Sequence, residues 1–120
     1  MTADAMRSLA MVEVSMGRRD EGLRLFERVV EIGTEAFGAD SENTLLDRSN
    51  LGVMLVVMKR YDEALPHLRA GLKAKVFFQW NGKIYDPVRK DPRYVALAAE
   101  QERIKAGGVP ESTFQYAVPK

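Results

Sequence analysis

Few residues of this chain could do chemistry, and they are spread along its 120 positions. His67 is the only imidazole. Acid–base catalysis or metal binding there would need partner side chains that the sequence does not clearly supply. Its place between Pro66 and the apolar Leu68 predicts a solvated helix face with no chemical role.

Two acidic pairs, Asp20-Glu21 and Asp62-Glu63, could in principle act as paired carboxylates. Each pair is predicted in the first turn of a helix, where negative charge interacts favourably with the helix dipole, so we interpret both as helix starts. The chain has no cysteine, which excludes thiol nucleophiles, disulfides and cysteine-ligated zinc. It also lacks a phosphate-binding glycine loop, a nucleophile elbow and metal-ligand spacing. The sequence therefore predicts a protein that is not an enzyme and has no cofactor, catalytic residue or metal site.

Charge and hydropathy narrow the possible partners. Lys and Arg number 18 against 17 Asp and Glu, and the two signs are interspersed, whereas nucleic-acid binding needs a concentrated basic field. No apolar run approaches the roughly 18 residues that span a bilayer, and the first twenty residues lack the apolar stretch of a secretory signal. We expect one cytoplasmic domain with no nucleic-acid or membrane partner.

An internal repeat supplies the elements that would position any site. Shifted by 42 residues, the chain shows seven identities in a fifteen-residue window, where about one is expected by chance. The recurring residues are Leu9, Val14, Met16, Arg18, Asp20, Glu21 and Leu23, which return as Leu51, Val56, Met58, Arg60, Asp62, Glu63 and Leu65.

Each copy has the pattern of a helix, a short turn and a second helix. The turns are at 17–20 and 59–62, and connections this short require antiparallel helices. Gly38 is expected to end one helix and Ser41 to cap the next. Gly52 and Ala64 are expected to face each other and let the two backbones approach closely. The predicted hairpins cover about residues 3–36 and 45–78, so that residues 1–78 hold both.

The second copy resembles a tetratricopeptide repeat. The resemblance rests on Asn50-Leu51-Gly52 and on Tyr61-Asp62-Glu63-Ala64-Leu65 followed by Leu68 and Gly71. The 42-residue period and residues 37–45 resemble the longer variant found in kinesin light chains and many bacterial regulators. The resemblance implies an all-α fold, in which antiparallel helix-turn-helix repeats stack as a short right-handed solenoid of two hairpins. The family tolerates a proline where Pro66 stands, although Arg48 and Glu13 replace aromatic residues that are usual there.

The C-terminal third departs from the repeat. Residues 76–85 are compatible with a short β-hairpin turning at Asn81-Gly82, or with a helix ending at Gly82 in a left-handed cap, and we favour the cap. Asp91-Pro92 then predicts a helix, capped by the aspartate, that closes the open end of the stack and stops at residues 107–108. We expect a loop and capping helix over 79–108 and a flexible tail over 109–120. The neighbouring aromatic residues are expected to pack beneath the capping helix or, alternatively, to anchor a partner: Phe77, Phe78, Trp80 and Tyr85.

The resemblance implies a function in binding a protein or peptide. In this family the first helices of successive repeats line a concave surface, which gives a predicted partner-binding set from both copies. Its members are Arg7, Ser8, Met11, Ser15, Ser49, Asn50, Val53 and Val57. An alternative is self-assembly, because stacks usually need about three repeats and the N-terminal helix here is uncovered. The chain would then form a homodimer or belong to a longer array.

Overall fold

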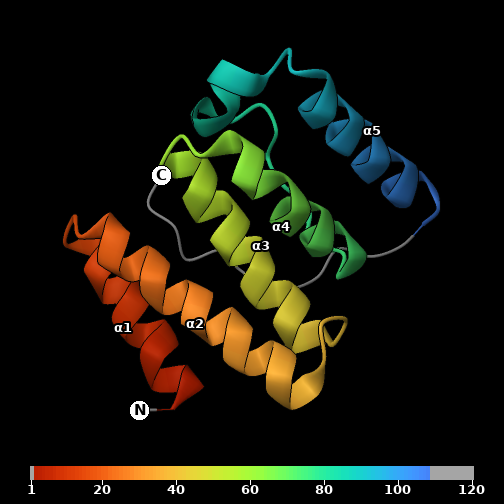
Figure 1. Ribbon diagram of the computed structural model, residues 1–120. Helices are drawn as coiled ribbons and strands as arrows, with labels where there is room; N and C mark the ends of the chain where they lie inside the picture. The colour runs from red at the N-terminus through yellow and green to blue at the C-terminus, as the bar shows by residue number, and fades with distance from the viewer. Residues whose placement is uncertain (1, 109–120) are drawn as a thin grey trace.

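The computed structural model describes residues 2–108 and contains no strand in that range. The predicted tail at 109–120 lies outside the described residues. The all-α prediction is confirmed, and Figure 1 shows the helices packed side by side along the chain order. The elements are α1 (Ala3–Ser15), α2 (Arg19–Phe37), α3 (Glu42–Val57), α4 (Tyr61–Lys73), the 3-10 helix η1 (Lys83–Val88) and α5 (Pro92–Ala106).

The two hairpins, α1–α2 and α3–α4, turn in the same way. Gly17 and Lys59 stand 42 residues apart, and both adopt left-handed backbone angles, with φ of 84° and 63°. In each turn the next amide donates back to the first helix: Arg18 to the Glu13 carbonyl and Arg60 to the Leu55 carbonyl, both at 2.8 Å. Lys59 adopts this angle despite its Cβ, because the same helix-ending hydrogen bonds are formed. The repeat in sequence is therefore a repeat in backbone geometry.

Small residues bring the helices of each hairpin together. A Cβ added at Gly22 would lie 2.5 Å from a methyl group of Val14 and 3.0 Å from the Ala10 carbonyl oxygen. A Cβ added at Gly52 would lie 3.0 Å from the Leu68 amide and 3.1 Å from the His67 Cβ. Close approach at Gly52 is confirmed, although the nearest atoms belong to His67 and Leu68 and not to Ala64.

The predicted helix ends at Gly38, Ser41 and Asp91 are confirmed. Gly38 ends α2 with a φ of 94°. The Ser41 hydroxyl accepts a hydrogen bond from the Thr44 amide at 3.3 Å, and the Asp91 carboxylate accepts one from the Arg93 amide at 2.9 Å. These caps satisfy amides that have no partner inside their own helix.

Both interpretations of residues 76–85 are wrong. Helix α4 already ends at Lys73, short of residue 78, and Lys75 takes the left-handed angle, with a φ of 63°. The chain then runs extended through Phe78, whose amide donates to the Gln101 side chain at 2.7 Å and whose carbonyl accepts from it at 3.0 Å. Gly82 has a φ of −69° and so is no left-handed cap. A glutamine of α5 satisfies this backbone, so neither a helix nor a hairpin partner is needed.

The aromatic residues pack beneath α5, as the first alternative predicted. The Trp80 ring lies 5.2 Å from that of Phe78, 5.1 Å from that of Tyr85 and 6.4 Å from that of Tyr94. The indole N–H of Trp80 donates to Gln101 at 3.0 Å. The Tyr94 hydroxyl donates to the Tyr61 carbonyl at 2.7 Å, and burial raises the pKa of Tyr94 to about 12. Together these contacts fasten α5 across the end of the second hairpin.

Candidate protein-interaction surface

The predicted partner-binding residues of α1 lie at or near the surface. Ser8, Met11 and Ser15 are exposed, and Arg7 is half-buried. Positions 8, 11 and 15 follow the three-to-four spacing of one helical face, so they form a continuous strip. Ala10 and Val14, which turn toward α2, are buried and hold the helix in place.

The predicted residues of α3 are less accessible. Ser49, Asn50 and Val53 are buried, and Val57 is half-buried. The Ser49 hydroxyl donates to the Leu46 carbonyl at 2.6 Å, and its Cβ lies beside Gly71 of α4. Ser49 therefore contributes to packing between α3 and α4, while the accessible part of the predicted set belongs mainly to α1.

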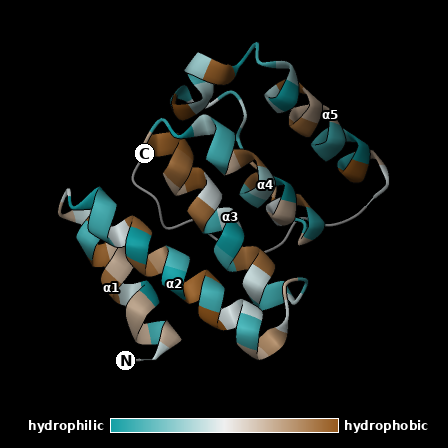
Figure 2. Ribbon diagram, in the orientation of Figure 1, coloured by the Kyte–Doolittle hydropathy of each residue, from teal (hydrophilic) through white to brown (hydrophobic). Residues whose placement is uncertain are grey.

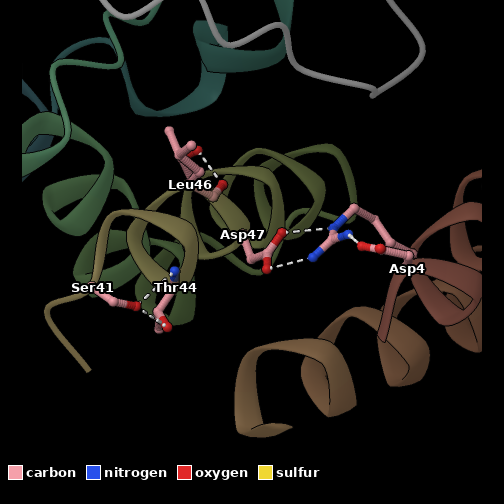
Figure 3. A network of polar contacts seen from close by, with 7 residues as sticks. Asp4, Ser41, Thr44, Leu46 and Asp47 are labelled. Atoms are coloured by element: carbon pink, nitrogen blue, oxygen red, sulfur yellow. Dashed lines mark hydrogen bonds and ion pairs between the residues drawn. The ribbon is translucent and has the colours of Figure 1, made fainter. Parts of the chain in front are cut away.

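An ion pair that was not predicted joins the two first helices. The Arg7 guanidinium donates to both carboxylate oxygens of Asp47, each at 2.9 Å, and also to Asp4 at 2.6 Å, as Figure 3 shows. The hydrogen bond to Asp47 is the main cause that raises the pKa of Arg7 above its ordinary value. Two parallel hydrogen bonds fix orientation as well as distance. The signal in the sequence was Asp47 at the position where the first copy has the small Ala5, with Arg7 two residues further along the first copy.

His67 is less solvated than predicted. Its Nδ1 accepts a hydrogen bond from the Arg48 side chain at 3.2 Å, and Arg48 also donates to the Pro66 carbonyl at 3.1 Å. Burial, and secondarily the positive charge of Arg48, lower the pKa of His67 to about 4, while Glu63 opposes the shift. A neutral imidazole that accepts from an arginine is a structural contact between α3 and α4.

A surface cleft of about 470 Å³ lies between α4 and α5. Its floor includes Leu72, Leu97 and Ile104. Its rim is mostly basic, and Glu100 is the one acidic residue among the lining residues. The basic rim residues are Arg69, Lys73, Lys75 and Arg103. An apolar floor with a basic rim is a surface that suits an apolar segment flanked by acidic residues.

The described residues show no cluster of histidines and carboxylates suited to a metal ion, and every buried side-chain polar atom among them has a partner. Within residues 2–108, no helix has both the length and the apolar content of a membrane crossing. Figure 2 shows hydrophilic and hydrophobic residues alternating along the helices, as amphipathic packing requires.

The two hairpins match a known protein family. A model described as Tetratricopeptide repeat matches residues 1–75. The chain belongs to the tetratricopeptide repeat family. No curated protein and no solved structure matches the chain. The family match spans α1 to α4, so that α1 and α3 are the first helices of two tetratricopeptide repeats.

Proposed function

We propose that this tetratricopeptide protein is an adaptor or scaffold that holds a segment of a partner protein on the side of the stack where α1 and α3 lie together, and that it catalyses no reaction. Membership of the family over residues 1–75 carries the proposal, since tetratricopeptide repeats are generally protein-interaction modules. Its repeats are of the 42-residue kind, a proposal supported by the separation of 42 residues between the matching turns at Gly17 and Lys59.

The chemistry of the exposed strip on α1 suggests what it binds. Met11 offers a flexible apolar side chain, and Ser8 and Ser15 on either side offer hydroxyls that both donate and accept. Such a strip suits an extended or helical segment that places one apolar side chain against the methionine. Asn50 and Val53 are buried, so their contribution is to the packing of α3, and the Arg7–Asp47 pair fixes the orientation of α1 relative to α3.

A matched pair of variants tests this surface. Met11 and Leu9 are each 37% exposed on α1, but lie on different sides of the helix. Proteins captured by the wild-type chain from a lysate of the source organism are identified by mass spectrometry. The captured protein that binds most strongly is purified for calorimetric titration. We expect Met11→Asp to weaken the affinity for this protein at least tenfold and Leu9→Asp to leave that affinity unchanged. Equal affinities for the wild type and Met11→Asp would contradict the proposal.

The cleft between α4 and α5 is a second candidate surface, favoured by its volume and its basic rim. It would take an apolar segment flanked by Asp or Glu. The same titration with Lys73→Glu separates the two surfaces, because Lys73 is well exposed and lies on the rim of the cleft. Loss of binding in Lys73→Glu with full binding in Met11→Asp would move the proposed site to the cleft.

A further inference from the structure

One side of α1 presents an apolar stripe to solvent. Leu9 is 37% exposed, Val12 49% and Met16 61%, and the small Ala5 continues the stripe toward the start of the helix. The spacing of four, three and four residues places all of them on one helical face. This face is distinct from that of Ala10 and Val14, which pack against α2.

The repeat shows what such a face does. In α3 the residues 42 positions later are Leu51 and Met54, which are 3% and 1% exposed, and Asp47, which is bound by Arg7 of α1. These positions are covered because α3 packs against the preceding hairpin, and a Cβ at Gly33 of α2 would lie 3.2 Å from the Thr44 hydroxyl. The corresponding face of α1 is therefore a helix-docking face, and no described element covers it.

The far end of the molecule determines how a second copy could reach this face. The ring of Phe78 lies so close to Gly71 that a Cβ there would be 2.6 Å from it, and α5 packs over α4. Because the last hairpin is closed in this way, copies cannot add head to tail. A self-complementary contact that buries the same face of both copies remains.

Glu13 limits the size of the contact. It stands where α3 has the buried Leu55, and its carboxylate accepts hydrogen bonds from Arg18 at 2.5 and 2.9 Å. A whole preceding hairpin would bury this ion pair at an energetic cost. The apolar stripe beside it is one helix wide, and so it fits a single docked helix.

We propose that α1 docks antiparallel against α1 of a second copy, across a two-fold axis between Leu9 and Val12. In this register Leu9 faces Val12 of the partner subunit, and the small Ala5 faces the long Met16 of the partner subunit. Ser8, at the edge of the stripe, then lies beside Glu13 of the partner subunit, so like charges do not meet there. This interface is additional to the proposed partner-binding surface, which is centred on Met11 on another side of α1, and the two surfaces share only the edge residue Ser8.

The oligomeric state tests the interface. A face one helix wide is at the small end of specific interfaces, so the dimer should dissociate in the micromolar range. Sedimentation equilibrium of the wild type should show a monomer–dimer equilibrium, and Val12→Glu should be monomeric at every concentration with unchanged helical circular dichroism. Val95→Glu on α5 is the matched control, since Val95 is 51% exposed, and it should dimerise as the wild type does. A monomeric wild type at millimolar concentration, or an unaffected Val12→Glu dimer, overturns the proposal.

Crosslinking tests the antiparallel register. The chain has no cysteine, so introduced thiols report without background. Residues 5 and 16 of one helix are about 16 Å apart, whereas a disulfide needs Cα atoms within about 7 Å. A mixture of Ala5→Cys and Met16→Cys chains should form disulfide-linked heterodimers on mild oxidation, and neither variant alone should crosslink. Efficient crosslinking of Ala5→Cys with itself would indicate a parallel pair and overturn the register.

The two proposals fail separately. Met11→Asp should lose the captured protein and keep the dimer, whereas Leu9→Asp should lose the dimer and keep the captured protein. A variant series in which both properties always disappear together would contradict the assignment of two independent faces.

Discussion

The first helices of the two hairpins, α1 and α3, carry related residues 42 positions apart but lie in different surroundings. Leu9 and Leu51 are the same residue at equivalent positions, and one is 37% exposed while the other is 3% exposed. Val12 and Met54 differ in the same direction. Residue type and helical position are nearly constant here, so the neighbour that packs on the helix decides burial. A face that is covered in α3 is therefore exposed in α1 among the described residues.

The second helices, α2 and α4, carry different residues at an equivalent position that is buried in both. Helix α2 has the buried Val29 where α4 has Gly71, and the absent side chain of Gly71 makes room for the ring of Phe78. The C-terminal end is thus closed by a residue from the extended segment after α4, and Gln101 of α5 holds that segment in place. The C-terminal end of the stack is therefore covered, whereas the outer face of α1 at the other end is exposed.

The largest expected difference in stability is between core variants of α3 and surface variants of α1. We expect Met54→Ala to lower the free energy of unfolding by about 2–5 kcal/mol, because it leaves a cavity at a fully buried position. Val12→Ala, at the equivalent exposed position, should change it by less than about 0.5 kcal/mol in dilute protein. Urea unfolding followed by circular dichroism measures both. Equal changes in the free energy of unfolding would show that the two positions do not differ in burial.

The closed end can be tested by giving α4 the residue of α2. Gly71→Val should cost about 1–3 kcal/mol, because its Cβ would lie 2.6 Å from the Phe78 ring and 2.8 Å from the Ser49 Cβ. Displacement of Phe78 should also change the near-ultraviolet circular dichroism of the neighbouring Trp80. Gly107→Ala is the control, since its Cβ would make only ordinary contacts, and it should stay within about 0.5 kcal/mol. An unchanged aromatic spectrum in Gly71→Val would contradict this packing.

The ion pair between the hairpins should have a smaller effect. Arg7→Met should cost about 1–3 kcal/mol, because it leaves the buried Asp47 carboxylate without its bidentate partner. Asp47→Ala installs the residue that Ala5 provides in the first copy, and it should cost less, since the freed Arg7 is partly exposed. The double variant should be more stable than the sum of the single costs predicts, by about 1 kcal/mol. Asp4→Ala, at an exposed carboxylate, is the control and should change stability by less than about 0.5 kcal/mol. Strictly additive costs would show that the pair does not couple the hairpins.

The contact between Arg48 and His67 should have the smallest effect on stability, and this effect should depend on pH. The pKa of His67 is about 4 in the fold and about 6.5 in an unfolded chain, so the unfolded state binds more protons between these values. Stability from this group is therefore complete above about pH 6.5 and is lost as the pH falls toward 4. His67→Leu, which installs the residue that Leu25 provides in the first copy, should flatten the curve between these limits by about 1–2 kcal/mol, which is less than the full pKa difference would give because the imidazole is only partly buried and water screens its charge. Because His67 is the only imidazole, its proton resonances give the pKa directly, and a value near 6.5 would refute the prediction.

Much of the fold was predictable because its signals are local. The 42-residue repeat, the two turns and the caps at Ser41 and Asp91 follow from helical periodicity and from side chains that bond the nearest free amides. The aromatic cluster was expected beneath α5 because Trp80 and its neighbours are too apolar to stay in water. The predicted partner-binding residues lie on α1 and α3, but their accessibility did not follow from their positions in the repeat.

The sequence by itself determined that this protein is a pair of helical hairpins of the tetratricopeptide kind, since each helix carries its own periodicity and its own end signals. The tertiary structure decided where α4 ends, that Ser49, Asn50 and Val53 are buried, and that Leu9 remains exposed while Leu51 does not. These features depend on contacts between distant segments, such as Gln101 with the backbone of Phe78 and Arg7 with Asp47. A local pattern specifies which face of a helix is apolar, but only the packed neighbours determine which apolar face is covered.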